Sequence, residues 1–149
     1  MQIRPAQQHD HLVLLDIWQQ SVRASHDFLS EQDIQSLLPI VRDMALPNLE
    51  IWVLCSDGTV PIGFMGLDGN KVEALFIAPS SFGQGGGTLM LDHARKLKGP
   101  LQVDVNEQNP RAAAFYLAHG FSIAGRSSTD AQGQAFPLLH LCEVGQDRV

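Results

Sequence analysis

Two short stretches near the middle of the chain hold residue types that suit a catalytic site. The first covers residues 80–88, SSFGQGGGT, with four glycines in five positions. Glycine lets backbone N–H groups approach an anion closely and lets the chain turn with a positive φ. Because a helical pattern begins at about Gly86, the loop would add unpaired N–H donors and the positive end of a helix dipole. The stretch therefore predicts a site for a phosphorylated ligand.

The second stretch covers residues 109–121, NPRAAAFYLAHGF, and contains the single tyrosine of the chain, Tyr116. Asn109 suits a helix N-cap, and Pro110 suits the first helical position. Gly120 suits the stop at the other end. Tyr116 would then stand on a short helix, where it could be a packed aromatic residue whose hydroxyl is bonded nearby.

Two further residues could accept a proton. Glu73 is the lone carboxylate in an apolar strand pattern over residues 72–77. Because burying an acid without a partner is costly, we expect Glu73 to face a cleft or water. It could simply be a solvated side chain of the strand. His26 is a rival base, since histidine titrates near neutral pH, but it could also cap the next helix.

Two helices are expected to pack on a sheet through an apolar face. Apolar residues at helical spacing predict such faces. The first helix begins at about Asp10, and its expected face comprises Leu12, Leu15, Trp18 and Val22. The second begins behind the glycine loop, and its expected face comprises Leu89, Met90, His93, Ala94 and Leu97.

Turn and cap signals divide the rest of the chain. Ser30 with Asp33 indicates a capping box, and Pro39 should kink or split the helix that follows. Asp57 and Gly58 indicate a tight hairpin turn. Strands are expected at residues 2–5, 51–55, 60–67, 72–77, 101–105, 121–125 and 136–144. The predicted order of elements is therefore β, α, α, β, β, β, α, β, α, β, β.

Length and composition limit the class of protein. A chain of 149 residues with 44% hydrophobic residues is expected to form one domain, 1–149. The net charge of −6 argues against nucleic acid as a partner. No apolar run approaches about 18 residues, so no membrane partner is expected and the cytoplasm is the default location. We expect Cys55 and Cys142 to be free thiols, and we expect no metal site.

Other phosphate-binding loops fit the glycine stretch less well. A Walker A loop needs a lysine after the glycines, and none follows here. A dinucleotide fingerprint needs a third glycine where Thr88 stands, and such a unit usually opens its domain. Two alternatives nevertheless stay open from the residues alone: a nucleotide-binding domain of another fold, and a flexible loop with no ligand.

Together the loop and the tyrosine helix resemble the GNAT N-acetyltransferase superfamily. The pyrophosphate loop of that family reads Gln or Arg, two residues, Gly, one residue, Gly or Ala, and it maps to residues 82–87. Phe82 stands where the family usually has Arg or Gln. A second family pattern reads Asn, three residues, Ala, two residues, Tyr, three residues, Gly-Phe. It matches Asn109, Ala113, Tyr116, Gly120 and Phe121.

The resemblance implies an α/β (α+β) fold with a mixed, strongly twisted sheet of about seven strands and helices on both faces. It also implies acetyl-CoA (coenzyme A) as cofactor, and direct acetyl transfer to a primary amine in a ternary complex. Tyr116 would be the general acid toward the coenzyme A sulfur, and Glu73 the base. A non-catalytic acyl-CoA-binding module of the same fold is the alternative, because Phe82 departs from the family pattern.

Binding residues for both ligands also follow from the resemblance. The expected cofactor contacts are Leu75, Phe76, Ile77, Phe82, Gly83, Gln84, Gly85, Gly86, Gly87, Thr88, Asn109, Ala113 and Tyr116. The acceptor, a small-molecule or peptide amine, is expected to contact Trp18, His26, Asp27, Phe28, Arg126 and Asp130. The protein is expected to be a monomer or a homodimer.

Overall fold

A single seven-stranded sheet organises the protein in the computed structural model, which describes residues 1–57 and 59–143. The strand order is β1-β2-β3-β4-β5-β7-β6. The strands are β1 (Gln2–Pro5), β2 (Glu50–Cys55), β3 (Pro61–Asp68), β4 (Lys71–Ile77), β5 (Gln102–Asn106), β6 (Phe121–Ser127) and β7 (Leu138–Glu143). Neighbouring strands are antiparallel except for the parallel pair β4 and β5. The predicted mixed sheet is confirmed.

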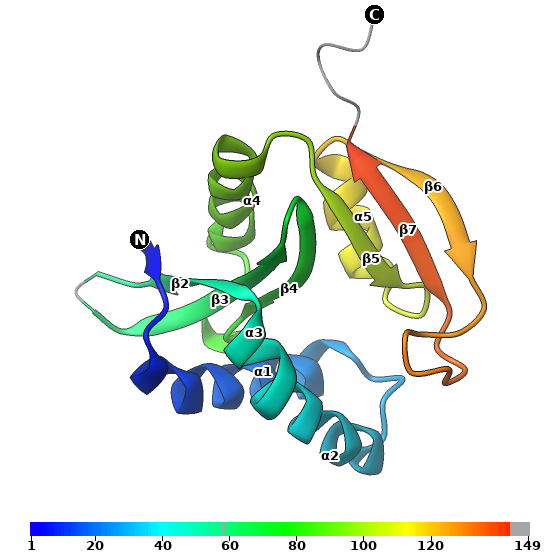
Figure 1. The fold of residues 1–149 in the computed structure, drawn as a ribbon, viewed down its shortest axis with the longest axis horizontal. Helices are drawn as coiled ribbons and strands as arrows, with labels where there is room; N and C mark the ends of the chain where they lie inside the picture. The colour runs from blue at the N-terminus through cyan, green and yellow to red at the C-terminus, as the bar shows by residue number, and fades with distance from the viewer. Residues whose placement is uncertain (58, 144–149) are drawn as a thin grey trace, which may run out of the picture.

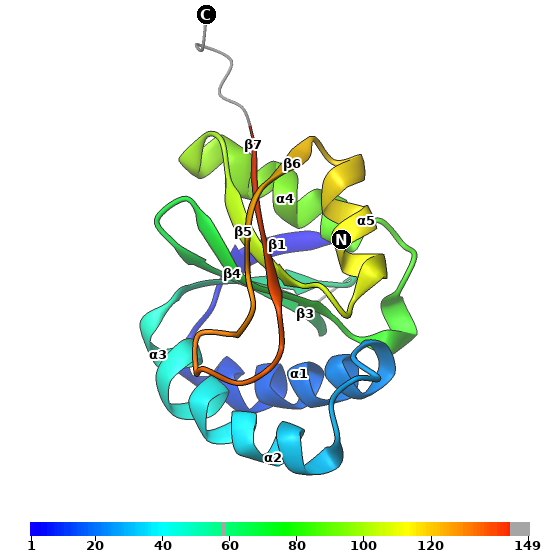
Figure 2. The same ribbon diagram turned by 90° about the vertical axis from the view of Figure 1, so that its right-hand side faces the viewer.

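Helices cover both faces of this sheet (Figures 1 and 2). They are α1 (His11–Ser25), α2 (Glu31–Ile40), α3 (Leu46–Asn48), α4 (Gly86–Lys98) and α5 (Pro110–Ala118). One core joins α1 and α2 to the sheet through side chains such as Leu14, Ile34 and Phe64. The other core joins α4 and α5 to the opposite face through Met90 and Tyr116, among others. Packing in the two cores holds the helices that carry the candidate site in place on the sheet.

A gap opens in the middle of the sheet between β4 and β5. The register of this pair joins Lys71 to Gln102 and Val72 to Val103, and goes no further within the described residues. The next residue, Glu73, is the extra residue of a β-bulge, because Gly66 pairs with Ala74 while Leu67 pairs with Val72. A bulge bends its strand, so β4 turns away from β5 at this point. Figure 1 shows β5, β7 and β6 standing apart from β2, β3 and β4.

The predicted helix caps are present. Ser30 Oγ accepts a hydrogen bond from Asp33 N–H at 3.1 Å, and Asp33 Oδ2 accepts one from Ser30 N–H at 2.9 Å. Asn109 Oδ1 accepts from Ala112 N–H at 3.2 Å. These bonds satisfy N–H groups that the first turn of a helix leaves without partners, and they set where α2 and α5 begin.

Both predicted helix faces were wrong in part. In α1 the prediction included Leu12, which is 79% exposed, whereas Leu14 and Ile17 are buried. In α4 Leu89 and Leu97 are exposed, and the buried face centres on Met90, Leu91 and Ala94. Helical spacing alone leaves the rotation of a helix loosely defined. In α4 the buried Gly86 packs closely on the sheet, since a Cβ there would lie 2.7 Å from Leu54 Cδ2.

Pro39 does not end its helix. Helix α2 runs through Pro39 to Ile40, and a π-helical turn, Val41–Ala45, follows at once. Two predictions reach beyond the described residues: Gly58 of the expected hairpin turn, and Val144 at the end of the expected last strand. Among the described residues, every helix is too short or too polar to cross a membrane.

Candidate active site

Two cavities meet in the gap between β4 and β5. The larger, about 490 Å³, is lined by the glycine loop and one side of α5. The smaller, about 180 Å³, is lined by β4, β5 and the start of α5. Both are lined by His26, Leu75, Asn109, Ala112 and Tyr116. A ligand in one cavity could therefore touch a ligand in the other at these five residues.

The glycine loop leaves backbone donors facing the larger cavity. Gly85 has a φ of 85° and forms the N-cap of α4. The first turn of the helix closes with the bond from Leu89 N–H to the Gly85 carbonyl, at 3.1 Å. The N–H groups of residues 86–88 precede that bond and have no acceptor within the helix. They form the kind of site that binds phosphate at a helix N-terminus.

Close packing favours glycine at two of these positions. A Cβ on Gly86 would lie 2.7 Å from Leu54 Cδ2, and a Cβ on Gly87 would lie 2.9 Å from Phe115 Cζ. The glycines thus let the start of α4 approach the sheet and α5 directly. The loop predicted from the sequence is therefore also a packing element between the two helices.

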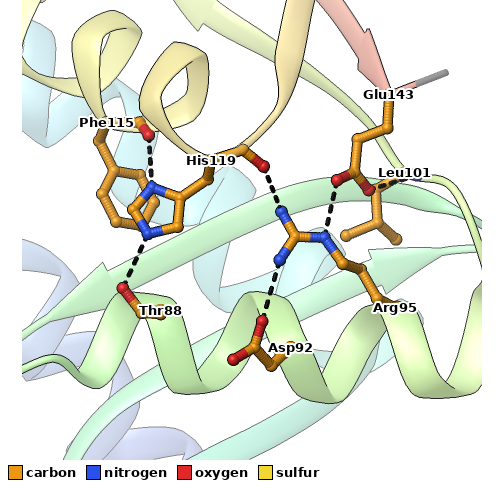
Figure 3. Close-up of polar contacts among 7 residues, drawn as sticks. All are labelled: Thr88, Asp92, Arg95, Leu101, Phe115, His119 and Glu143. Carbon is orange, nitrogen blue, oxygen red and sulfur yellow. Dashed lines mark hydrogen bonds and ion pairs between the residues drawn. The ribbon is translucent and has the colours of Figure 1, made fainter.

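A hydrogen-bonded clamp holds α4 against α5 and the C-terminal half of the sheet (Figure 3). His119 Nδ1 donates to the Phe115 carbonyl at 2.7 Å, so His119 Nε2 accepts from the Thr88 hydroxyl at 2.8 Å. Arg95 donates to the His119 carbonyl at 2.6 Å and to Glu143 Oε2 at 2.7 Å. Because the Thr88 hydroxyl proton is used in this way, Thr88 faces the larger cavity with its backbone N–H as the free donor.

An unpaired edge of β4 borders both cavities. Ala78 N–H donates to the Ile62 carbonyl on β3 at 2.7 Å. Because N–H groups alternate in direction along an antiparallel strand, those of Leu75 and Ile77 point away from β3, toward the gap. Leu75 lines both cavities, and Ile77 lines the larger. This edge could pair with an extended ligand as an added strand would.

Tyr116 stands at the junction of the cavities with little exposure to solvent. It is 7% exposed, and its ring packs edge-on against Phe115 and Phe121 at centroid distances of 5.2 and 5.3 Å. Burial raises the pKa of Tyr116 well above its ordinary value, because the phenolate would lose hydration. The hydroxyl therefore keeps its proton at neutral pH, as a proton donor must.

His26 reaches the same junction from the loop after α1. Ser25 Oγ donates to the Ser21 carbonyl at 2.7 Å, so it accepts from His26 Nδ1 at 2.8 Å. His26 Nε2 is then an acceptor, and it lies 3.4 Å from Asn109 Nδ2. Burial lowers the pKa of His26, against the opposing effect of the Asp27 charge. The imidazole is therefore neutral at pH 7, with a lone pair directed at the site.

Glu73 lines the smaller cavity, as expected of a residue that faces a cleft. The bulge directs its side chain, which is 35% exposed and lies 3.2 Å from Lys71 Nζ. The same ammonium lies 2.9 Å from Asp104 Oδ2 on the facing strand. Glu73 is therefore part of a charged cluster and is not an isolated acid.

The other expected cofactor contacts fall into three groups. Phe82 and the loop glycines line the larger cavity, with Phe82 44% exposed. Phe76 lines the smaller cavity. Gln84 and Ala113 line neither of these two cavities; Ala113 packs instead against the core beneath α5.

The expected acceptor residues are mostly not gathered at the cavities. Trp18 is 4% exposed and lies in the core under α1. Arg126 pairs with Glu107, and Asp130 accepts the N–H groups of two residues of its own loop. Neither Arg126 nor Asp130 lines the two cavities, so the structure does not bring them to the mouth expected beside His26.

The loop after α1 supplies the remaining two. Asp27 is exposed, and Phe28 packs against His26 at a centroid distance of 5.4 Å. Phe28 also contacts Phe136 of the loop between β6 and β7, at 5.9 Å. Phe28 therefore holds His26 in place and joins two loops, without lining either cavity.

Among the residues at the cavities that the sequence did not predict, two carry a formal charge. Arg111, in the first turn of α5, lines the larger cavity, and the ion pairs of the described residues do not include it. Asp104 lines the smaller cavity. Asp104 carried the signal that singled out Glu73, a carboxylate within an apolar strand pattern. Arg111 resembles any charged residue on a helix surface.

A sheet parted between two parallel strands, with a glycine loop and a buried tyrosine at the gap, defines an N-acetyltransferase of the GNAT type. A family model described as an acetyltransferase (GNAT) domain matches residues 47–123. The chain belongs to this family. The match excludes a nucleotide-binding domain of another fold, which was one of the alternatives left open by the sequence.

Similar proteins include two bacterial enzymes. The peptidyl-lysine N-acetyltransferase YjaB of Salmonella typhimurium is 42% identical over 139 residues, which are 93% of this chain and 95% of that protein. YjaB of Escherichia coli is 41% identical over 96% of this chain and 97% of that protein. The chain is thus an acetyltransferase, as expected from the loop and the tyrosine helix.

Solved structures agree with the fold. The solution structure of apo YjaB from Escherichia coli has a TM-score of 0.89 at 40% identity, covering 97% of both chains. The PaiA N-acetyltransferase of Thermoplasma acidophilum, solved in complex with coenzyme A, has a TM-score of 0.72 at 19% identity, covering 96% of this chain and 99% of that chain. The second likeness concerns the fold alone.

Proposed function

We propose that the protein transfers an acetyl group from acetyl-CoA to the side-chain amine of a lysine residue, by direct attack in a ternary complex. The observation that carries the proposal is the meeting of two cavities at Leu75, His26 and Tyr116. Each cavity would hold one substrate, and the acetyl group would cross at the junction. Lysine is proposed because the YjaB enzymes, 41–42% identical to this chain, are named peptidyl-lysine N-acetyltransferases.

The larger cavity fits the cofactor. The N–H groups of residues 86–88 would hold the pyrophosphate, and the β4 edge at Leu75 and Ile77 would pair with the pantetheine arm. Arg111 would supply the positive charge that Phe82 lacks at the loop. When bound there, acetyl-CoA supplies a thioester as acyl donor.

Three groups of the chain would act on the acyl transfer itself. Leu75 N–H, directed into the gap, would donate to the oxyanion that forms as the amine attacks. A preorganised donor of this kind is worth about 3 kcal/mol of barrier. The Tyr116 hydroxyl would donate to the departing sulfur. Glu73 would accept the proton of the attacking amine, through a water, at the mouth of the smaller cavity.

His26 is a second candidate for the base, favoured by its place at the junction and its unprotonated Nε2. Its lowered pKa keeps it neutral, and so able to accept a proton, to a pH below its ordinary value of 6.5. If His26 is the base, kcat/KM should decrease on the acid side with a midpoint below pH 6.5, and this decrease should be absent in His26→Gln. If Glu73 is the base, Glu73→Gln removes the acid-side loss and His26→Gln leaves it.

The experiment that tests the function combines binding with turnover. Calorimetric titration with acetyl-CoA, with ATP and NAD as controls, should give selective binding. Release of free thiol should then depend on a lysine peptide. Tyr116→Phe should lower kcat about 100-fold or more with acetyl-CoA binding retained. Binding of acetyl-CoA without thiol release for any amine would favour the non-catalytic acyl-CoA-binding module instead.

A further inference from the structure

A row of polar side chains crosses four strands on the sheet face opposite α5, beside the smaller cavity. Lys71 Nζ lies 3.2 Å from Glu73 Oε1 on its own strand β4 and 2.9 Å from Asp104 Oδ2 on β5. Asp104 Oδ1 lies 2.6 Å from His140 Nδ1 on β7. His140 Nε2 lies 2.6 Å from Ser127 Oγ on β6. The row therefore runs unbroken from the bulge of β4 to the outer strand of the sheet.

The row begins where the sheet parts. Val72 and Val103 form the last pair of β4 and β5, and Glu73 and Asp104 are the residues that follow them on the two strands. Both carboxylates line the smaller cavity, on its opposite walls. The Lys71 ammonium lies between them. Two carboxylates with one cation leave a net negative charge at the entrance to the proposed acceptor site.

The contacts of Lys71 indicate that the two carboxylates can bind a primary ammonium. A primary ammonium has three donors and no acceptor, and two facing carboxylates satisfy it from both sides. Hydrogen bonding and charge from Asp104, then Glu73, raise the pKa of Lys71, so it stays charged. Burial alone would raise the pKa of Asp104, but the hydrogen bonds from Lys71 and His140 outweigh this and lower it. Asp104 is therefore ionised and able to attract a second ammonium.

His140 and Ser127 fix the position of Asp104. Because Asp104 is ionised, His140 Nδ1 donates to it, and Nε2 is left to accept from the Ser127 hydroxyl. Ser127, His140 and Asp104 thus stand in the order found in activated serine nucleophiles. Ser127 lines neither of the two cavities, however, and lies two strands from the gap. The arrangement therefore suits the orientation of Asp104 better than chemistry at Ser127.

We propose that Asp104, opposite Glu73, is the site that binds the acceptor lysine as its charged ammonium, and that Lys71 occupies this site in the free protein. The inference rests on the proposed function, since it names the group that recognises the amine. The acceptor ammonium would displace Lys71 Nζ from the carboxylate pair, and it would then lie beside Glu73 for loss of its proton. His140 is a positioning residue that acts through Asp104.

Binding measurements test this without turnover. Protein saturated with coenzyme A, which carries no acetyl group, is titrated with a lysine peptide and with the same peptide containing norleucine at that position. The unmodified protein should bind the lysine peptide at least tenfold more tightly. Asp104→Asn should remove that preference, and Glu107→Gln should keep it, because Glu107 pairs with Arg126 away from both cavities. Retention of the preference in Asp104→Asn would overturn the proposal.

Kinetics separate this inference from the proposed function. Asp104→Asn should raise KM for the lysine peptide at least tenfold, with kcat within about threefold and KM for acetyl-CoA unchanged. His140→Phe should raise the same KM by a smaller factor, and His140→Asn should restore part of it. Lys71→Met should lower that KM, because the competing ammonium is gone; a rise would overturn the role given to Lys71. If the peptide binds as expected but is not acetylated, the proposed function fails and the binding site stands.

Discussion

At the scale of single residues, the burial of Tyr116 can be measured directly, because the chain has no other tyrosine. Burial raises its pKa above the ordinary value of 10.0. We expect tyrosinate absorbance in the near ultraviolet to stay absent as the pH of the folded protein passes about 10. In denaturant the same titration should have its midpoint near that ordinary value.

The control for this measurement is Tyr116→Phe, which should show no tyrosinate signal in either state. A folded-state midpoint at the ordinary value would contradict the described burial, and would also place the hydroxyl in water. Since a proton donor must hold its proton, the same raised pKa predicts no loss of kcat from Tyr116 ionisation up to about pH 10.

Arg111 gives a second prediction at this scale. It is the cation of the larger cavity, while Phe82 takes the loop position where Arg or Gln is usual in the family. Arg111→Gln should weaken acetyl-CoA binding about tenfold, or about 1.4 kcal/mol, because a charge-assisted contact with phosphate is lost. The loss should shrink at high salt. Calorimetric titration measures it.

The matched control is Arg42→Gln, since Arg42 pairs with Asp43 in the π-helical turn and lies outside the cavity. Phe82→Arg in the Arg111→Gln protein should restore part of the affinity. If Arg111→Gln binds acetyl-CoA as well as the unmodified protein does, the backbone N–H groups alone hold the phosphates.

Some single residues of the site were predictable from the sequence and others were not. Tyr116 and Asn109 were found because their spacing and their cap and stop signals agree with one another. Asp104 carried the same signal as Glu73, a carboxylate within an apolar strand pattern. Trp18 was placed at the acceptor site by the family resemblance, but a large apolar side chain at helical spacing belongs to the core more often than to a ligand site. Charge pairs such as Arg126 with Glu107 join distant stretches and leave no local pattern.

At the scale of elements, the close contact between α4 and α5 depends on the absence of a side chain at Gly87. A Cβ on Gly87 would lie 2.9 Å from Phe115 Cζ and 3.3 Å from its Cε1. Gly87→Ala should therefore push the start of α4 away from α5. Overpacking of this kind costs about 1–3 kcal/mol. Gly87→Ala should therefore lower the Tm measured by thermal unfolding and weaken acetyl-CoA binding measured by titration.

A second substitution tests the cause. Phe115→Leu in the Gly87→Ala protein should recover acetyl-CoA binding, because the ring that meets the new methyl group is removed. Gly125→Ala serves as the control, since its Cβ would make an ordinary contact of 3.6 Å with His140. Equal affinity for acetyl-CoA in Gly87→Ala and the unmodified protein would show that the loop tolerates a side chain here.

The first residue of a helix was predictable where the capping hydrogen bonds join residues close in sequence. The capping box of α2 and the N-cap of α5 are bonds between residues three apart, so the sequence contains both partners. Helix rotation was not predictable to the same degree. Leu89 and Leu97 fit the helical period of α4, but the side chains that the sheet offers decide which face is buried. The bulge at Glu73 also left no local sign, although it positions the candidate base.

At the scale of the whole molecule, the Arg95 clamp joins α4 to β7, to the residue after α5 and to the residue before β5 (Figure 3). Arg95 donates to Asp92, Glu143 and the His119 carbonyl, and Glu143 Oε1 also accepts from Leu101 N–H at 3.0 Å. Arg95→Met should lower the free energy of unfolding by about 2–3 kcal/mol, since several charge-assisted bonds are lost together. For a chain of this size that is a fall in Tm of roughly 4–12 °C.

Lys96→Met is the matched control, because Lys96 is the exposed neighbour of Arg95 on the same helix. Its Tm should change by less than about 1 °C, as expected for a surface substitution. If both substitutions lower Tm equally, the loss reflects helix charge and the clamp contributes little.

The order of strands and helices in the whole molecule was predictable because each element has its own periodicity and breakers. The seven-stranded mixed sheet was expected from the family resemblance and is present. The parting of β4 and β5 could not be predicted locally. Residues 72–77 and 101–105 have the patterns of ordinary strands, and nothing in either stretch indicates that the two strands share two pairs only.

Because β4 and β5 part, a bound cofactor would also stabilise the folded protein. The two halves of the sheet share little backbone pairing, and a bound pantetheine arm would occupy the missing strand position. A ligand that binds only the folded state stabilises it by about 2.7 kcal/mol at 100 times its dissociation constant. The protein with coenzyme A or acetyl-CoA bound should then resist proteolysis better than the free protein, because the ligand would hold the two halves of the sheet together.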